Sequence, residues 1–119
     1  MPDVWRFTWP FLPSSINHRY GNRKDGGKYL LAKAKGSMSR MQGEVWAAGF
    51  RVDLAKCYEI EIVFTMPDWG HDIDGPIKET LDACFGHLSD HRVTKLVVTK
   101  RVESGQSQTD VTIREMQEG

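Results

Sequence analysis

The stretch YEIEIVFT, residues 58–65, alternates polar and apolar side chains before it becomes continuously apolar. Both patterns are typical of β-strands, and Pro67 marks where the run ends. We therefore predict a strand over residues 58–65, with further elements on both sides of it.

Three elements are predicted before this strand. VWRFTW, residues 4–9, is rich in β-branched and aromatic residues and stops at Pro10, which predicts a first strand. Residues 10–28 contain Pro, Ser, Asn and Gly and predict a loop, and loops longer than about 12–15 residues are usually functional or disordered. In residues 35–48, apolar side chains recur three and four positions apart, which predicts an amphipathic helix that ends at Gly49.

A second helix is predicted over residues 76–86, because proline is favoured in a first helical turn and apolar residues follow at helical spacing. Its inward-facing side chains would be Ile77, Leu81, Cys84, Phe85 and Leu88. Residues 93–102 and 110–115 alternate on either side of SGQSQ and predict a terminal hairpin. The order strand, helix, strand, helix, strand, strand predicts one α+β domain over residues 1–119, in which two helices pack on a small mixed sheet of about four strands.

The net charge of zero conceals a division within the chain. Residues 18–51 hold eight Lys and Arg against two Asp and Glu, a net charge of +6, and residues 52–119 hold seven against thirteen, a net charge of −6. The division predicts a basic surface for a polyanion and a separate acidic cluster. The alternative is a set of solvated charges without a partner, and composition weighs the two equally.

Other features of the composition concern the compartment. No apolar run approaches the roughly 20 residues that span a bilayer, and the N-terminus lacks the pattern of a secretory signal. Cys57 and Cys84 fall inside predicted elements, which favours buried thiols over a disulfide. We therefore expect a cytoplasmic protein without membrane contact.

The stretch HDIDGPIKETLD, residues 71–82, places the carboxylates of Asp72 and Asp74 at the approach to the second helix. The residue before proline resists the α conformation, so we expect Gly75 to lie outside the helix or at its cap. One explanation of the two carboxylates is capping, because unpaired backbone N–H groups and the helix dipole favour anions there. The other is a divalent-metal site, because Mg²⁺ prefers carboxylate oxygens and side chains two residues apart point the same way in an extended segment.

A third carboxylate, Asp90, lies in the connection between the second helix and the third predicted strand. It begins at the far end of that helix, so it can join the pair only if the chain returns along the strand or a second subunit brings it. Metal phosphohydrolases also carry His-Asp doublets like His71-Asp72, but they need further histidines on a predominantly helical scaffold. We therefore expect His71 to be a solvent-exposed neighbour rather than a ligand.

These residues form an ordered set. Asp72-x-Asp74 near a helix start, Lys78 four residues later, Asp90 before the next strand and the loop PSSINHRY at residues 13–20 resemble the RusA-type Holliday-junction resolvases. Chain length and element order are also similar, so the resemblance covers nearly the whole sequence. It implies a homodimeric, Mg²⁺-dependent endodeoxyribonuclease, with Mn²⁺ as a possible substitute, that acts in DNA recombination and repair in bacteria, prophages or phages and nicks four-way junctions symmetrically.

The resemblance also implies roles for individual residues. Asp72, Asp74 and Asp90 would hold the metal, and Lys78 would contribute to catalysis. Apart from the resemblance, Lys78 is expected to form an i,i+4 ion pair with Asp74 or Asp82, worth only about 0.2–0.5 kcal/mol.

The basic segment supplies the expected DNA interface. Its candidate phosphate contacts are Arg19, Arg23, Lys24, Lys28, Lys33, Lys35 and Arg40. Tyr20, Tyr29 and Trp69 are candidates for stacking on unpaired bases. The family pattern has Asn where this chain has Gly75, so the alternative function is a non-catalytic module that binds junctions or other nucleic acid.

Overall fold

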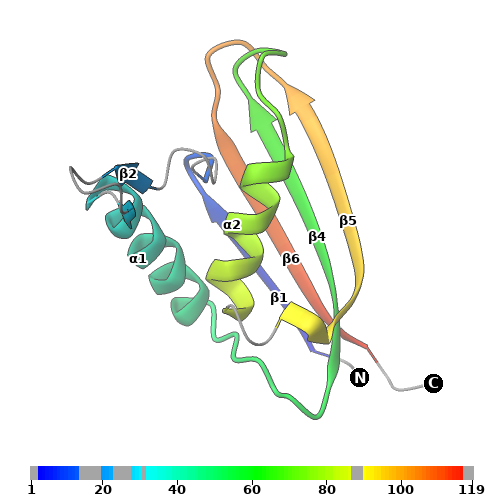
Figure 1. The fold of residues 1–119 in the computed structure, drawn as a ribbon. Coiled ribbons are helices and arrows are strands. Elements are labelled where there is room, and N and C mark those ends of the chain that lie inside the picture. The colour runs from blue at the N-terminus through cyan, green and yellow to red at the C-terminus, as the bar shows by residue number, and fades with distance from the viewer. Residues whose placement is uncertain (1–2, 14–19, 23–27, 31, 87–89, 117–119) are drawn as a thin grey trace.

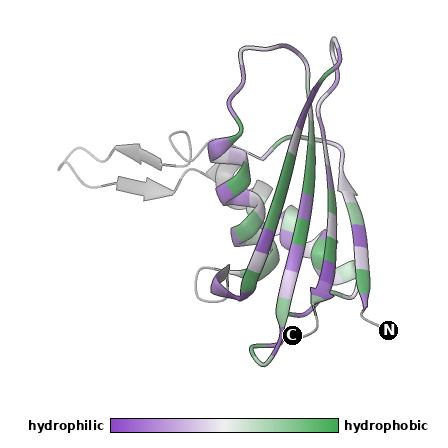
Figure 2. Cartoon of the chain, turned by 90° about the vertical axis from the view of Figure 1, so that its right-hand side faces the viewer, coloured by the Kyte–Doolittle hydropathy of each residue, from purple (hydrophilic) through white to green (hydrophobic). Residues whose placement is uncertain are grey.

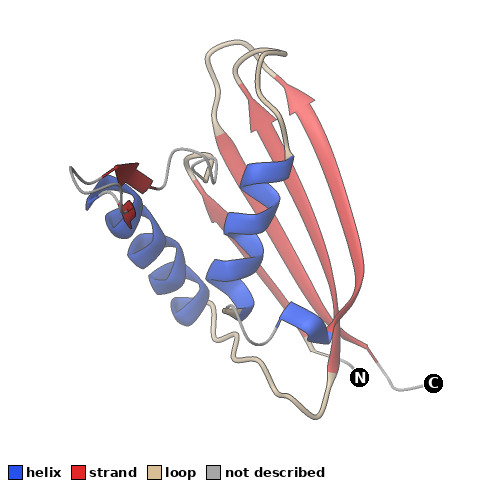
Figure 3. Ribbon diagram, in the orientation of Figure 1, coloured by secondary structure: helices blue, strands red, loops and turns tan. Residues whose placement is uncertain are grey.

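The structure is a computed structural model that describes residues 3–13, 20–22, 28–30, 32–86 and 90–116. Four strands form one mixed sheet in the order β1-β6-β4-β5 (Figure 1). Their bounds are Val4–Trp9 (β1), Cys57–Met66 (β4), Val93–Val102 (β5) and Gln108–Met116 (β6). The helices Ala32–Ala47 (α1) and Asp74–Phe85 (α2) lie on one face of this sheet (Figure 3). The predicted α+β class is confirmed.

β4 lies inside the sheet because one of its two sides is apolar along its whole length. The side chains on the helix-covered side are at most 1% exposed and are those of Tyr58, Ile60, Ile62, Phe64 and Met66. Hydrophobic and hydrophilic residues alternate along the strands, as Figure 2 shows. The predicted strand over residues 58–65 is confirmed and is one residue longer at each end.

β5 and β6 do not pair with each other, so the predicted terminal hairpin is wrong. β4 lies between them, parallel to β5 and antiparallel to β6, and β6 also pairs with β1. β5 lies at an edge of the sheet, and its helix-facing Leu96 is 43% exposed there.

β4, α2 and β5 form a β-α-β connection, which decides where the acidic residues lie. α2 begins just after the loop that leaves β4 and runs back along the sheet, so a short 3₁₀ turn, Asp90–Arg92 (η2), lies at the opposite end (Figure 1). α2 starts two residues earlier than predicted, and Gly75 lies inside its first turn. Glycine lacks the Cβ that collides with a following proline ring, so it can adopt the α conformation before Pro76.

Most of the side chains that were predicted to face inward on α2 do so. Cys84 and Phe85 are buried, and Ile77 and Leu81 pack against the core while partly exposed. Leu88 lies outside the described residues.

α1 buries Met41 and Val45, as its three-four spacing predicts, and starts three residues earlier than expected. Gly49 ends it with a φ of 85°, a value that glycine adopts without strain. The N–H of Gly49 donates to the carbonyl of Trp46 at 3.0 Å, and that of Phe50 donates to the carbonyl of Val45 at 3.3 Å. This is the Schellman pattern, so the predicted stop at Gly49 is confirmed.

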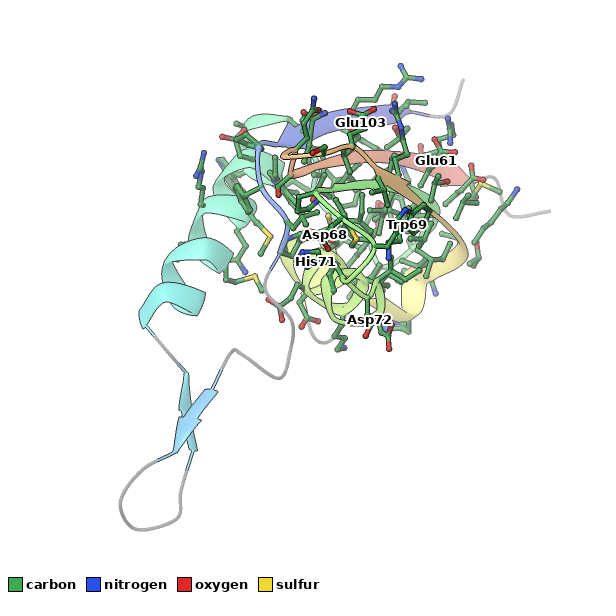
Figure 4. All side chains as sticks on the ribbon, turned by 90° about the horizontal axis from the view of Figure 1, so that it is seen from above. Glu61, Asp68, Trp69, His71, Asp72 and Glu103 are labelled. Atoms are coloured by element: carbon green, nitrogen blue, oxygen red, sulfur yellow. The ribbon has the colours of Figure 1, made fainter. Side chains whose placement is uncertain are left out.

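Residues 10–28 are not wholly loop. Tyr20–Asn22 (β2) and Lys28–Leu30 (β3) pair antiparallel as a separate two-stranded sheet. Figure 4 shows this hairpin beyond the N-terminal end of α1, away from the four-stranded sheet. Residues 14–19 and 23–27 lie outside the described part of the chain.

An aromatic cluster, made of Trp5, Phe50, Tyr58 and Phe85, joins β1, the segment after α1, the start of β4 and the end of α2. The Phe50 ring lies 5.0 Å from Trp5, 5.3 Å from Tyr58 and 5.4 Å from Phe85, with edge-to-face geometry in each pair. The Tyr58 hydroxyl accepts a hydrogen bond from the N–H of Asp53 at 2.8 Å. The cluster therefore closes one end of the helix–sheet interface.

Both cysteines are free thiols. Cys84 is buried, and burial raises the pKa of its thiol well above the usual range, whereas Cys57 is only partly buried. None of the described helices is both long enough and apolar enough to cross a bilayer.

Candidate metal site

Asp72 and Asp74 lie at the N-terminal end of α2, where both side chains are exposed. Asp72 belongs to the loop of residues 67–73, here called the acidic loop, and Asp74 is the first residue of the helix. The cap position is held by Ile73, whose side chain has no acceptor. Neither aspartate is therefore the capping residue, although the helix dipole still favours negative charge at this end.

Lys78 lies one turn after Asp74 on the same side of α2, since residues four apart share a helix face. Its Nζ is 3.4 Å from Oδ1 of Asp82, so of the two ion pairs expected from the sequence the structure has the one with Asp82. The Lys78 side chain is 45% exposed, whereas that of Asp82 is 1% exposed. Nothing in the sequence marks Asp82 as functional, because a single Asp at helical spacing is typical of a solvent-facing residue.

The acidic loop has internal contacts that shape it. The Asp68 carboxylate accepts a hydrogen bond from the N–H of Gly70 at 2.8 Å, and its Oδ1 lies 3.6 Å from Nε2 of His71. Asp68 and His71 are side by side in Figure 4, and Asp72 lies farther out. His71 is exposed, as the sequence predicts, and contacts Asp68 within the loop.

Lys100 on β5 holds the acidic loop from outside it. Its ammonium donates to the main-chain carbonyls of His71 and, at 3.4 Å, of Trp69, and it lies 5.5 Å from the centre of the Trp69 ring. Sequence reasoning missed this residue. A lysine at the end of an alternating strand normally faces water.

Asp90 is separated from the pair within one chain. Its backbone lies in η2, at the end of α2 opposite to Asp74 (Figure 1). α2 has 12 residues, so it places about 18 Å between these two ends. The side chain of Asp90 lies outside the described part. The sequence left two ways for Asp90 to join Asp72 and Asp74. The chain does not bring Asp90 back along the strand to the pair, so the way that is left is supply of Asp90 by a second subunit.

The donors that are present fit Mg²⁺ in kind. This ion is commonly held by one or two carboxylates, with waters and substrate phosphates completing six ligands, and Asp72 and Asp74 are exposed carboxylates. Within the described residues, no group of three or more His, Cys, Asp or Glu is placed to hold a metal. Glu61 does not join the pair, because it lies on the uncovered face of β4, away from Asp72 (Figure 4).

The expected DNA contacts fall largely on parts of the chain whose side chains are not described. Arg19, Arg23 and Lys24 lie outside the described residues, and for Lys28, Lys33 and Lys35 the backbone alone is described. Arg40 is exposed on α1, and its guanidinium carbon lies 4.8 Å from the centre of the Phe11 ring. Of the stacking candidates, Trp69 is 77% exposed.

The chain matches no known protein-family model and no curated protein sequence. Its class is therefore defined by the fold and the local chemistry. It is a small α+β protein with an exposed pair of aspartates at a helix N-terminus.

Proposed function

We propose that this protein is a Mg²⁺-dependent, structure-selective DNA endonuclease that resolves four-way junctions by paired, symmetric nicks. The observation that carries the proposal is the exposed Asp72 and Asp74 pair at the start of α2, with Lys78 one turn away on the same side of the helix. The ordered sequence set that resembles the RusA-type resolvases gives the pair its assignment to DNA cleavage.

The chemistry asked of the chain is hydrolysis of a phosphodiester. Bound Mg²⁺ lowers the pKa of a coordinated water and offsets charge on the scissile phosphate. Asp72 and Asp74 contribute anionic oxygens, and their exposure allows a DNA backbone to approach them. Lys78 carries three N–H donors, so its contact with Asp82 is compatible with a further one to a phosphate oxygen.

The proposal includes a homodimer. A four-way junction offers two strands to cut, and a two-fold dimer presents one active site to each. A partner copy is also the remaining route by which Asp90 reaches a pair at the other end of α2, a helix about 18 Å long. The basic residues of segment 18–51 would hold phosphates without reading bases.

The test is cleavage of a labelled four-way junction in Mg²⁺ by the wild type, Asp72→Asn and Asp74→Asn. We expect paired nicks from the wild type and loss of cutting in both variants. Glu61→Gln is the matched control, since Glu61 is an acid on the uncovered face of β4, away from Asp72 and outside the basic segment. Equal cutting by the wild type and Asp72→Asn would remove that residue from the mechanism.

Mixing variants tests whether the site is shared between subunits. We expect Asp90→Asn to be inactive alone and partly active when mixed with Asp72→Asn, because one site of the mixed dimer then has all three carboxylates. Junction binding that is indifferent to Mg²⁺, with no product after long incubation, would instead identify the non-catalytic binding module.

A further inference from the structure

Lys100 occupies an unusual position for a lysine. In the register of the parallel pair it lies beside Phe64, which is fully buried, and Leu96 and Val98 precede it on the same side of β5. That side faces the helices, where the sheet buries its apolar residues. The partly buried Lys100 side chain runs along this side and ends at the acidic loop, a common arrangement for a long stem with a charged head.

Three contacts of the Lys100 ammonium converge on the residues just before Asp72. Two are with the main-chain carbonyls of His71 and Trp69, and the third is with the face of the Trp69 ring. The other described polar side-chain contacts of this loop, Asp68 with Gly70 and with His71, are internal to it, and Ile73 at its end packs against the hydrophobic core. Among the described residues, Lys100 is thus the side chain that ties the loop to the sheet by hydrogen bonds.

We propose that Lys100 is a positioning residue of the metal site: it holds the carbonyls of residues 69 and 71 against the sheet and so sets where the Asp72 carboxylate lies. The expected effect of Lys100 on Mg²⁺ affinity rests on the proposed function. Removal of a residue that orients a metal ligand without contacting the metal typically lowers metal affinity by about 10–100-fold. Lys100 acts through the backbone and has no contact with the metal.

The experiment compares Lys100→Met, which keeps the stem and loses the charge, with Lys100→Arg, which keeps both. Lys95→Met is the matched control, because Lys95 is on the same strand and pairs with Glu59 on the opposite face. Two quantities are measured for each: NMR order parameters of the amides of residues 68–72 without metal, and Mg²⁺ affinity by calorimetric titration.

In Lys100→Met we expect the order parameters of these amides to fall below about 0.6, the range of flexible backbone. We expect Mg²⁺ affinity to fall about tenfold. Lys100→Arg should keep most of both, and Lys95→Met should match the wild type. Loop amides in Lys100→Met that are as ordered as in the wild type would overturn the inference, as would loosened amides with unchanged Mg²⁺ affinity.

Failure of the proposed function gives a different result. A wild type that takes up no Mg²⁺ would reject the metal site itself. The anchoring of the acidic loop by Lys100 would then stand or fall by the order parameters alone.

Discussion

The two ends of α2 differ in almost every physical respect. At the C-terminal end, Phe85 is 3% exposed and packs on Phe50 and Tyr58 in the aromatic cluster. At the N-terminal end, Asp72 and Asp74 are exposed, and the loop that carries Asp72 is tied to the sheet by Lys100. One helix therefore has an end that packs into an aromatic cluster and an end where two exposed carboxylates precede the buried Pro76.

The difference suggests how a small domain can combine stability with an exposed, charged site. Burial of large aromatic side chains contributes most of the stability per residue, and this contribution does not depend on the exposed side chains. Exposed carboxylates contribute little to folding, so a chain can use them for binding without losing its fold. Function is accordingly expected at the polar end of α2, and the fold should depend on the other end.

The largest effect is expected at the aromatic cluster. Phe85→Ala should lower the free energy of unfolding by about 3–5 kcal/mol, because it removes a buried ring and leaves a cavity against Phe50 and Tyr58. Denaturant unfolding followed by circular dichroism measures this change.

The comparison variant at the other end is Asp72→Asn, which should change the free energy of unfolding by no more than about 0.5 kcal/mol. Equal losses in the two variants would contradict the contrast between the ends. A loss below about 1 kcal/mol in Phe85→Ala would show that the cluster rearranges to fill the cavity.

A smaller change in the free energy of unfolding is expected at the C-terminal end of α1, just before Phe50. Gly49→Ala should cost about 1–2 kcal/mol, because a residue with a Cβ is strained at a φ of 85°. Apart from the two neighbours of Gly49 in the chain, no described residue has an atom within 4 Å of the added Cβ, so the cost is backbone strain and not a clash.

Gly43→Ala provides the control within the same helix. Gly43 lies in the interior of α1, and among the described residues no side chain comes within 4 Å of a Cβ added there, so alanine should stabilise the protein by about 0.5–1 kcal/mol. Thermal unfolding should shift in opposite directions for the two variants. The same direction for both would mean that Gly49 does not need its positive φ.

The fold was predictable wherever one residue or one period decides the local structure. Pro10 ends the first strand at Trp9, as predicted, and Gly49 ends α1 through its backbone freedom. Pairing was not predictable in the same way. Alternation shows which side of a strand is buried, but it does not say which strand lies beside it, and so β4 between β5 and β6 was missed.

The candidate site was predictable only in part, for a related reason. Asp72, Asp74 and Lys78 lie within one short stretch, and local spacing was enough to place them together. Lys100 is about thirty residues away from its partners His71 and Trp69, and only the parallel register of β5 brings it to them. Asp90 lies at the end of α2 opposite to Asp74, as its place after that helix in the sequence predicts.

The smallest expected effect concerns pH at the end of the sheet that holds the aromatic cluster. A hydrogen bond from Lys95, together with the charges of Lys95 and Arg114, lowers the pKa of Glu59, and a hydrogen bond from Lys56 lowers the pKa of Glu115. Both acids lie where β4 begins, because Tyr58 pairs with Glu115 and Glu59 with Arg114.

A folded-state pKa below the unfolded value, about 4.3 for Glu, stabilises the protein above that pH, and the stabilisation is lost as pH falls through the folded-state pKa. The double variant Glu59→Gln and Glu115→Gln should therefore be less stable than the wild type at pH 7, by a small amount because the pairs are near the surface, and the difference should vanish in acid. Denaturant midpoints measured between about pH 7 and pH 2.5 test this. A difference that persists unchanged at the lowest pH would mean that the two glutamates act through packing, and that the charged contacts at this end add nothing to its stability.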